Sequence, residues 1–355
     1  MRERLKTLRE IATCVFLVCE LSWEAYRQRL REGRSLFAPT LKARPHALRR
    51  AALDGRPLSS EPFLRPTRYA DSRAPEIVAL ADDFRAETGS DWEYASAIFE
   101  FVCNHIDVCF DFPPQHGVVG TLERGFGTCI EKLNLLVALA RAGGIRARYC
   151  TIGIDPAQAG VLALMEDDDG IFGVLNQSSK RFIAEKNDPR AKRIASFNLW
   201  CSSRFRKGFK KRVLDGTLDA AQNQWTHFVA ELRIGDGWIA ADPTVSDEDC
   251  AAYKWPLQRF GFEPLILGRF MGLAINGRSE ALPFRWRRYI FWIAHLCVSR
   301  GFFDHINSFG ERQRAVGRDL LEEIGSETMR LKRQHLQRRI SPVAERPGLL
   351  HAAEH

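Results

Sequence analysis

The sequence predicts a protein that combines helices with antiparallel β-structure, and three segments carry this prediction. Apolar residues recur at helical spacing through residues 72–110. Residues 129–141 form a strongly apolar helix that ends at a pair of glycines, and residues 145–154 then have the composition of a strand. Residues 225–244 contain two β-forming arms on either side of a Gly-Asp-Gly turn, which is the pattern of a β-hairpin.

The predicted elements fall into three blocks along the chain. The first block, residues 1–64, is expected to be a helical segment followed by a proline-rich connector. The second, residues 65–260, holds two helices, at 72–87 and 91–107, before the segments described above, and the first residue of the latter helix is its expected cap. The third, residues 261–355, is predicted to be a helical C-terminal extension.

The least predictable part of the second block is an insertion at about residues 158–216, which is polar and basic with scattered aromatic residues. The formal net charge of the chain is +8, a balance that suits nucleic acid, anionic lipid or an acidic substrate, or simply a solvated surface. Dense basic runs occur at residues 204–212 and 330–339. Neither a zinc-finger spacing nor an RNA-binding aromatic signature accompanies them, so no nucleic-acid partner is expected.

The cysteines indicate a cytoplasmic protein. There are nine of them, widely spaced and without a C-x-x-C pair, which favours reduced thiols over a disulfide framework or a zinc ribbon. No metal-ligand spacing is present, so neither a metal nor another cofactor is expected. The apolar run at residues 11–19 is interrupted by Glu20 and favours a buried helix over a signal peptide. Residues 285–303 favour a core helix, with peripheral membrane contact as the alternative.

Cys129 is the thiol best placed for nucleophilic chemistry. Thr128 and Glu131 form the Thr-x-x-Glu pattern of a capping box, which puts Cys129 at the first position of its helix. Unpaired N–H groups and the helix dipole favour an anion there, and the thiolate is the reactive form of cysteine. Gly125 and Gly127 are expected to let a substrate approach the backbone. The competing interpretation is a structural cysteine, because free cysteines are usually buried.

His227 and Asp242 lie on the two arms of the predicted hairpin. If the turn is a two-residue Gly-Asp turn, Asp242 lies opposite Val229 and therefore on the same face of the sheet as His227. One ring nitrogen would then meet the carboxylate, and the other would be free to take a thiol proton. A turn one residue later keeps both side chains on that face, whereas a three-residue loop separates them. An Asp before proline is also a common turn opening.

Two blocks of the sequence together resemble the transglutaminase-like superfamily, in its bacterial form. The first block reads GFGTCIEKLNLLVALARAGGIRARY, residues 125–149, and is similar to the family's cysteine helix followed by Arg-x-x-Gly-Ile-x-Ala-Arg. The second reads HFVAELRIGDGWIAADPT, residues 227–244, and is similar to the family's histidine strand, glycine turn, Trp and Asp-Pro-Thr. The resemblance extends over about residues 65–250.

This resemblance implies a papain-like α+β fold, in which the helix that carries Cys129 packs on an antiparallel sheet that carries His227 and Asp242. By matched position, Cys129 is the nucleophile, His227 the base and Asp242 the residue that orients the base. The implied substrate is a peptide, a protein or an acyl-thioester. The family's side-chain oxyanion donor is not identified by the sequence, and Gln115 and Trp92 are the two candidates.

The functional hypotheses differ in what they require of Cys129. The first is a thiol-dependent enzyme that forms a thioester, either an amide or peptide hydrolase or an acyltransferase that delivers the acyl group to an amine. The sequence does not separate these two, because the choice of acceptor depends on how the closed site excludes water. The second hypothesis is a catalytically silent binding or scaffold protein that uses its basic segments as contact surfaces. An inert Cys129 would favour the second.

Overall fold

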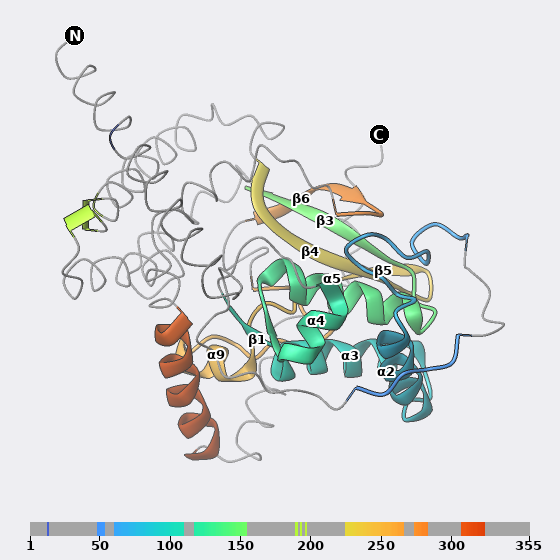
Figure 1. Cartoon of the computed structure of the whole chain (residues 1–355), viewed down its shortest axis with the longest axis horizontal. Helices are drawn as coiled ribbons and strands as arrows, with labels where there is room; N and C mark the ends of the chain where they lie inside the picture. The colour runs from blue at the N-terminus through green and yellow to red at the C-terminus, as the bar shows by residue number, and fades with distance from the viewer. Residues whose placement is uncertain are drawn as a thin grey trace, which may run out of the picture.

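Figure 1 shows a sheet with helices layered against it, and α5 lies at the centre of the molecule. The insertion expected at 158–216, the segment 285–303 and Gln115 lie largely or wholly outside the described residues. The computed structural model describes residues 48–53, 60–109, 117–154, 224–265, 273–282 and 307–323, with isolated residues 13, 189, 190, 192, 193 and 196.

The two helices predicted within residues 72–110 and the predicted cysteine helix form where the apolar periodicity placed them, with small differences at their ends, whereas the helices at Gly117–Arg124 and Asp247–Ala252 were not predicted. The second of the two predicted N-terminal helices is capped by Ser90, whose side chain accepts a hydrogen bond from Glu93 N–H, and not by Asp91 as the sequence predicted. Ser90 has the extended backbone that an N-cap requires. The helices are α2 (Pro75–Ala86), α3 (Asp91–His105), α4 (Gly117–Arg124), α5 (Cys129–Ala142) and α9 (Asp247–Ala252).

Four strands form one antiparallel sheet in the order β5-β4-β3-β6. The predicted hairpin is the pair β4 and β5, and the predicted strand after the cysteine helix is β3. Two further strands, β1 (Asp107–Val108) and β2 (Phe126–Gly127), form a short parallel pair of their own. The bounds of the main strands are β3 (Ala147–Ile154), β4 (Gln224–Ile234), β5 (Gly237–Ala241) and β6 (Leu273–Ser279).

The core lies between α5 and one face of the sheet. Residues 131–141 of α5 are buried around the whole circumference of the helix, as expected for a helix inside a domain. Alternate strand residues supply the opposite side of the core, among them Tyr149, Ala230, Leu232 and Ile239. The described chain therefore has the α+β core that the sequence predicted, with the cysteine helix packed against an antiparallel sheet.

The segment predicted as a helical extension also contributes a strand to the sheet. β6 pairs with β3, a partner far away in the sequence, so its strand character depends on a tertiary contact that local pattern does not show. Residues 307–323 form a helix, which agrees with the predicted character of this region. This helix crosses α9 closely, because a Cβ placed on Gly317 would lie 1.9 Å from Glu248 O.

Among the described helices, none combines the length and apolar character needed to cross a lipid bilayer. The segment 285–303, for which membrane contact was the alternative, lies outside the described residues. That alternative therefore stays a prediction.

Candidate active site

Cys129 is the first residue of α5, and the structure forms the capping box that the sequence predicted. Thr128 Oγ1 accepts a hydrogen bond from Glu131 N–H at 3.2 Å, and Glu131 Oε2 accepts one from Thr128 N–H at 2.8 Å. Thr128 O accepts the N–H of Lys132 at 2.9 Å. The thiol therefore lies at the positive end of the helix dipole. Its side chain is partly exposed, whereas the other described cysteines are buried.

A short parallel strand pair holds the loop that leads to Cys129. The N–H of Cys109 donates to Gly127 O at 2.9 Å, which continues the pairing of β1 with β2. Gly125 has a φ of +69°, a conformation that other residues rarely adopt. A Cβ on Gly127 would lie 2.9 Å from Glu131 Cβ. The turn and the packing beneath the helix start require these two glycines, and the approach of a substrate to their backbone stays a prediction.

His227 and Asp242 meet across the hairpin. The Nε2 atom of His227 lies 2.9 Å from Oδ2 of Asp242. The strand register begins with Ile234 opposite Gly237, so the turn has the two-residue Gly-Asp form, one of the three alternatives that the sequence left open. Gly235 has a φ of +56°, as the primed hairpin turns require. This register places both functional side chains on the same face of the sheet.

The surroundings of His227 favour its protonated form. Burial acts to lower the pKa of the ring, whose side chain is only 12% exposed. The Asp242 carboxylate and a hydrogen bond with the Cys129 side chain outweigh burial and raise the pKa of His227 to about 10. Since Asp242 occupies Nε2, the ring nitrogen left for Cys129 is Nδ1. An imidazolium next to a thiol favours the thiolate.

Asp242 has a separate partner for each of its carboxylate oxygens. Oδ2 binds His227, whereas Oδ1 accepts from Thr244 N–H at 3.1 Å and from Thr244 Oγ1 at 2.5 Å. Burial acts to raise the pKa of Asp242, but His227 and Thr244 outweigh it and the pKa is lowered. The contact with Thr244 is the local turn that an Asp before proline commonly opens. Asp242 therefore has two roles: one carboxylate oxygen opens the turn, and the other binds His227.

The buried cysteines have environments that oppose thiolate formation. Burial raises the pKa of Cys103 and Cys150 well above the ordinary range, and raises the pKa of Cys250 to about 12. Cys109 is also buried. Among the described cysteines, Cys129 thus combines partial exposure with a basic partner.

Two arginines of the motif that follows the cysteine helix have structural partners. Arg141 is buried in the last turn of α5 and donates only to backbone carbonyl groups. Arg148 on β3 binds Glu231 Oε2 at 2.6 Å and lies 3.9 Å above the centre of the Trp238 ring. Glu231 is 1% exposed and also binds Arg278 at 3.0 Å. These motif residues hold α5 and the sheet in place.

Lys132 and Thr244 are residues near the site to which sequence reasoning assigned no role. Lys132 is fully buried and donates to Thr244 O at 3.1 Å. One signal was present in the sequence, because Lys132 lies in a helix made mostly of apolar residues. Trp92, one of the two candidates for the oxyanion donor, is 43% exposed and packs against Phe260. Within the described residues, no group of three His, Cys, Asp or Glu side chains could hold a metal ion.

Comparison with known proteins finds one family that this region resembles. Residues 78–243 match the model of a family described as the transglutaminase-like superfamily, and this segment contains Cys129, His227 and Asp242. This part of the chain is therefore similar to the transglutaminase-like superfamily. No curated protein matches the chain significantly.

One solved structure is also similar to the chain. It is a protein from Cytophaga hutchinsonii described as a "putative cysteine protease", with 19% identity and a TM-score of 0.30. The match covers 51% of this chain and 40% of that protein, so the chain spans less than half of its length.

Proposed function

We propose that this protein is a thiol-dependent acyl-transfer enzyme in which Cys129 is the nucleophile, His227 the general base and acid, and Asp242 the residue that orients the ring. The observation that carries the proposal is the position of His227. Its ring bonds to Asp242 through one nitrogen at 2.9 Å and also forms a hydrogen bond with Cys129. A cysteine-histidine pair oriented by a third group is the arrangement that activates a thiol nucleophile.

In the first half of the proposed reaction, the thiol proton passes to His227 and the sulfur attacks the carbonyl carbon of an amide, ester or thioester. The backbone N–H of Cys129, at the start of α5, is the proposed donor to the oxyanion. When the tetrahedral intermediate collapses, the bond to the leaving group breaks and His227 gives its proton to that group. The acyl group then remains on Cys129 as a thioester.

In the second half, a water molecule or an amine attacks the thioester. His227 takes a proton from the attacking group and returns it to the sulfur as the acyl product leaves, so the enzyme is restored. Water as acceptor makes the protein a peptide or amide hydrolase, and an amine makes it a transglutaminase-like acyltransferase. A comparison of product formation with and without added primary amines distinguishes these two activities.

The test is the rate at which iodoacetamide alkylates Cys129 as a function of pH, with each site assigned by mass spectrometry. An activated Cys129 should react near neutral pH at least about tenfold faster than an ordinary thiol, because His227 is placed to take its proton. The variant His227→Ala should remove this advantage. Cys250, which is buried on α9, is the internal control and should react slowly in both proteins.

An inert Cys129, or a reactivity that His227→Ala does not change, would contradict the enzyme proposal. The protein would then be interpreted as the catalytically silent binding protein, and the search would move to partners of its basic segments.

A further inference from the structure

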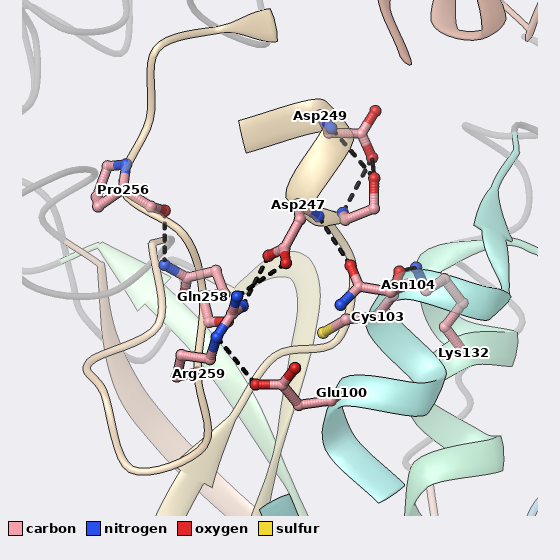
Figure 2. A network of polar contacts seen from close by, with 10 residues as sticks. Glu100, Cys103, Asn104, Lys132, Asp247, Asp249, Pro256, Gln258 and Arg259 are labelled. Atoms are coloured by element: carbon pink, nitrogen blue, oxygen red, sulfur yellow. Dashed lines mark hydrogen bonds and ion pairs between the residues drawn. The ribbon is translucent and has the colours of Figure 1, made fainter. Parts of the chain in front are cut away.

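Lys132 is a buried lysine one helical turn after Cys129, and the proposed reaction does not use it. Its side chain is 0% exposed, and its Nζ atom donates to Cys103 O at 3.2 Å and to Thr244 O at 3.1 Å. Figure 2 shows the side chain extending from α5 toward Cys103 and Asn104 near the end of α3. Burial lowers the pKa of Lys132, and burying a basic group is unfavourable unless it is well bonded, so an apolar residue would fill this space more favourably.

The carbonyl group of Thr244 connects Lys132 to the candidate active site. Thr244 lies two residues after Asp242 and donates its own N–H and hydroxyl to Oδ1 of that carboxylate. The other carboxylate oxygen binds His227, and the ring bonds to Cys129. Lys132 is therefore connected to Cys129 by hydrogen bonds that meet at Thr244, whose carbonyl faces Lys132 and whose N–H and hydroxyl face Asp242, and both ends of this connection lie in the first turn of α5.

The chain that follows Thr244 is held against α3 by separate contacts (Figure 2). The N–H of Asp247 donates to Asn104 Oδ1 at 2.9 Å, and the Asp247 carboxylate binds Arg259 at 2.7 and 2.8 Å. Arg259 also binds Glu100 on α3 at 2.9 Å. These contacts fix α9 and its flanks to α3, whereas Lys132 connects the Thr244 turn to the helix that carries the thiol.

We propose that Lys132 is a positioning residue, which holds the Thr244 turn against the start of α5 and thereby keeps the Asp242 carboxylate aligned with His227. The purpose of this alignment rests on the proposed function, in which the Asp242–His227 pair prepares Cys129 for attack. Lys132 touches neither the thiol nor the ring, and it acts only through Thr244 and Asp242. A carboxylate that is free to rotate would hydrogen-bond the ring less often and would stabilise the protonated ring less.

The test compares two variants that each remove a buried cation from α5. Lys132→Met removes the donor and keeps a side chain of similar length, and Arg141→Met is the matched control at the far end of the helix. Titration of full-length protein with ¹⁵N-labelled histidine, followed by NMR, reports the pKa of His227, whose signal is the one lost in His227→Ala. Urea unfolding of the same samples reports stability.

We expect Lys132→Met to lower the pKa of His227 by at least about one unit, a tenfold change in proton affinity. The alkylation rate of Cys129 at neutral pH should fall in the same variant. Arg141→Met should reduce stability and leave the pKa of His227 unchanged. An unchanged pKa in folded Lys132→Met overturns the proposal, and so does an equal fall in Arg141→Met, which would indicate a general loosening of the fold.

Lys132→Gln keeps an N–H donor with a shorter reach and should give an intermediate pKa. It replaces Lys132→Met in the same comparison if the methionine variant does not fold. The pKa of His227 is measured without turnover, so this test is separate from that of the enzyme proposal. An inert Cys129 together with a Lys132-dependent pKa would refute the enzyme and support the positioning role.

Discussion

Each end of α5 buries a basic side chain that donates hydrogen bonds to backbone carbonyl groups. The two side chains connect different parts of the protein. Lys132, in the first turn, makes two hydrogen bonds, to Cys103 O and Thr244 O. Arg141, in the last turn, makes four hydrogen bonds to the carbonyl groups of Arg65, Ala147 and Glu280.

This difference distinguishes Lys132, which contacts the turn next to the candidate site, from Arg141, which contacts only structural parts of the fold. Arg141 joins the end of α5 to the start of β3 and to the residue that follows β6, far along the helix from the candidate catalytic residues. Its planar guanidinium suits several acceptors at fixed angles. Lys132 has fewer bonds, yet one of them reaches the turn that holds Asp242. We therefore expect Arg141, with more hydrogen bonds, to contribute more to the stability of the fold, and Lys132, through its partner Thr244, to contribute to the geometry of the candidate site.

The largest effect that this comparison predicts is a loss of stability in Arg141→Met. Three carbonyl groups lose a buried donor, at about 1–3 kcal/mol for each group left unsatisfied. The free energy of unfolding should fall by at least about 3 kcal/mol in urea denaturation, while alkylation of Cys129 in the folded protein is retained. If Arg141→Met reduces the reactivity of Cys129 without reducing stability, the structural role assigned to Arg141 is wrong.

The helix over residues 307–323 crosses α9, and Gly317→Ala tests the packing at this crossing. The new Cβ would lie 1.9 Å from Glu248 O, a backbone atom of α9 that cannot rotate away. We expect a loss of about 1–3 kcal/mol in thermal or urea unfolding, as for other overpacked contacts. Gly310→Ala on the same helix is the control, since its Cβ meets only the end of the Arg314 side chain at 3.5 Å. A neutral Gly317→Ala would contradict this close crossing.

The pH dependence of stability tests the pair that Lys132 is proposed to align. In Cys129→Ala, where there is no thiol to titrate, we expect Asp242 still to hold the pKa of His227 above 6.5, because the carboxylate is a main cause of the raised pKa in the native protein. Between 6.5 and the raised value the folded protein keeps a proton that the unfolded chain has lost, so stability falls as pH rises. The slope from His227 is up to about 1.4 kcal/mol per pH unit.

Adding Asp242→Asn to Cys129→Ala should remove most of this slope, because the neutral amide no longer favours the charged ring. Urea unfolding at several pH values from about pH 6 to about pH 9 measures both proteins over the relevant window. Equal slopes in the two proteins would show that Asp242 does not hold the proton on His227.

The smallest predicted effect concerns the cap that begins α5. Thr128→Ala removes the acceptor for Glu131 N–H and should destabilise the protein by about 1 kcal/mol. Thr128→Ser keeps the hydroxyl and should preserve most of the stability. If the two variants unfold at the same urea concentration, the capping box contributes nothing measurable at this end of the helix.

Several features of the site could be predicted because their causes are local in the sequence. The capping box depends on residues three apart, so Thr128 and Glu131 were sufficient to place Cys129 at a helix start. The hairpin could also be predicted, and its two-residue turn, one of the forms that the sequence left open, fixes the register that places Asp242 near His227. The cap of α3 is Ser90 and not the neighbouring Asp91, because both residue types are favoured at an N-cap and the sequence does not choose between adjacent candidates.

The sequence by itself determined the mixed α+β class, the start of the cysteine helix and the presence of the hairpin whose arms carry His227 and Asp242, because each depends on neighbouring residues. The length of the hairpin turn was decided only by the structure. Only the tertiary structure decided that β6 joins the sheet beside β3 and that Lys132 is buried against Thr244. Both contacts join segments far apart in the chain, and a strand or a buried cation is stable only where folding supplies its hydrogen-bond partners.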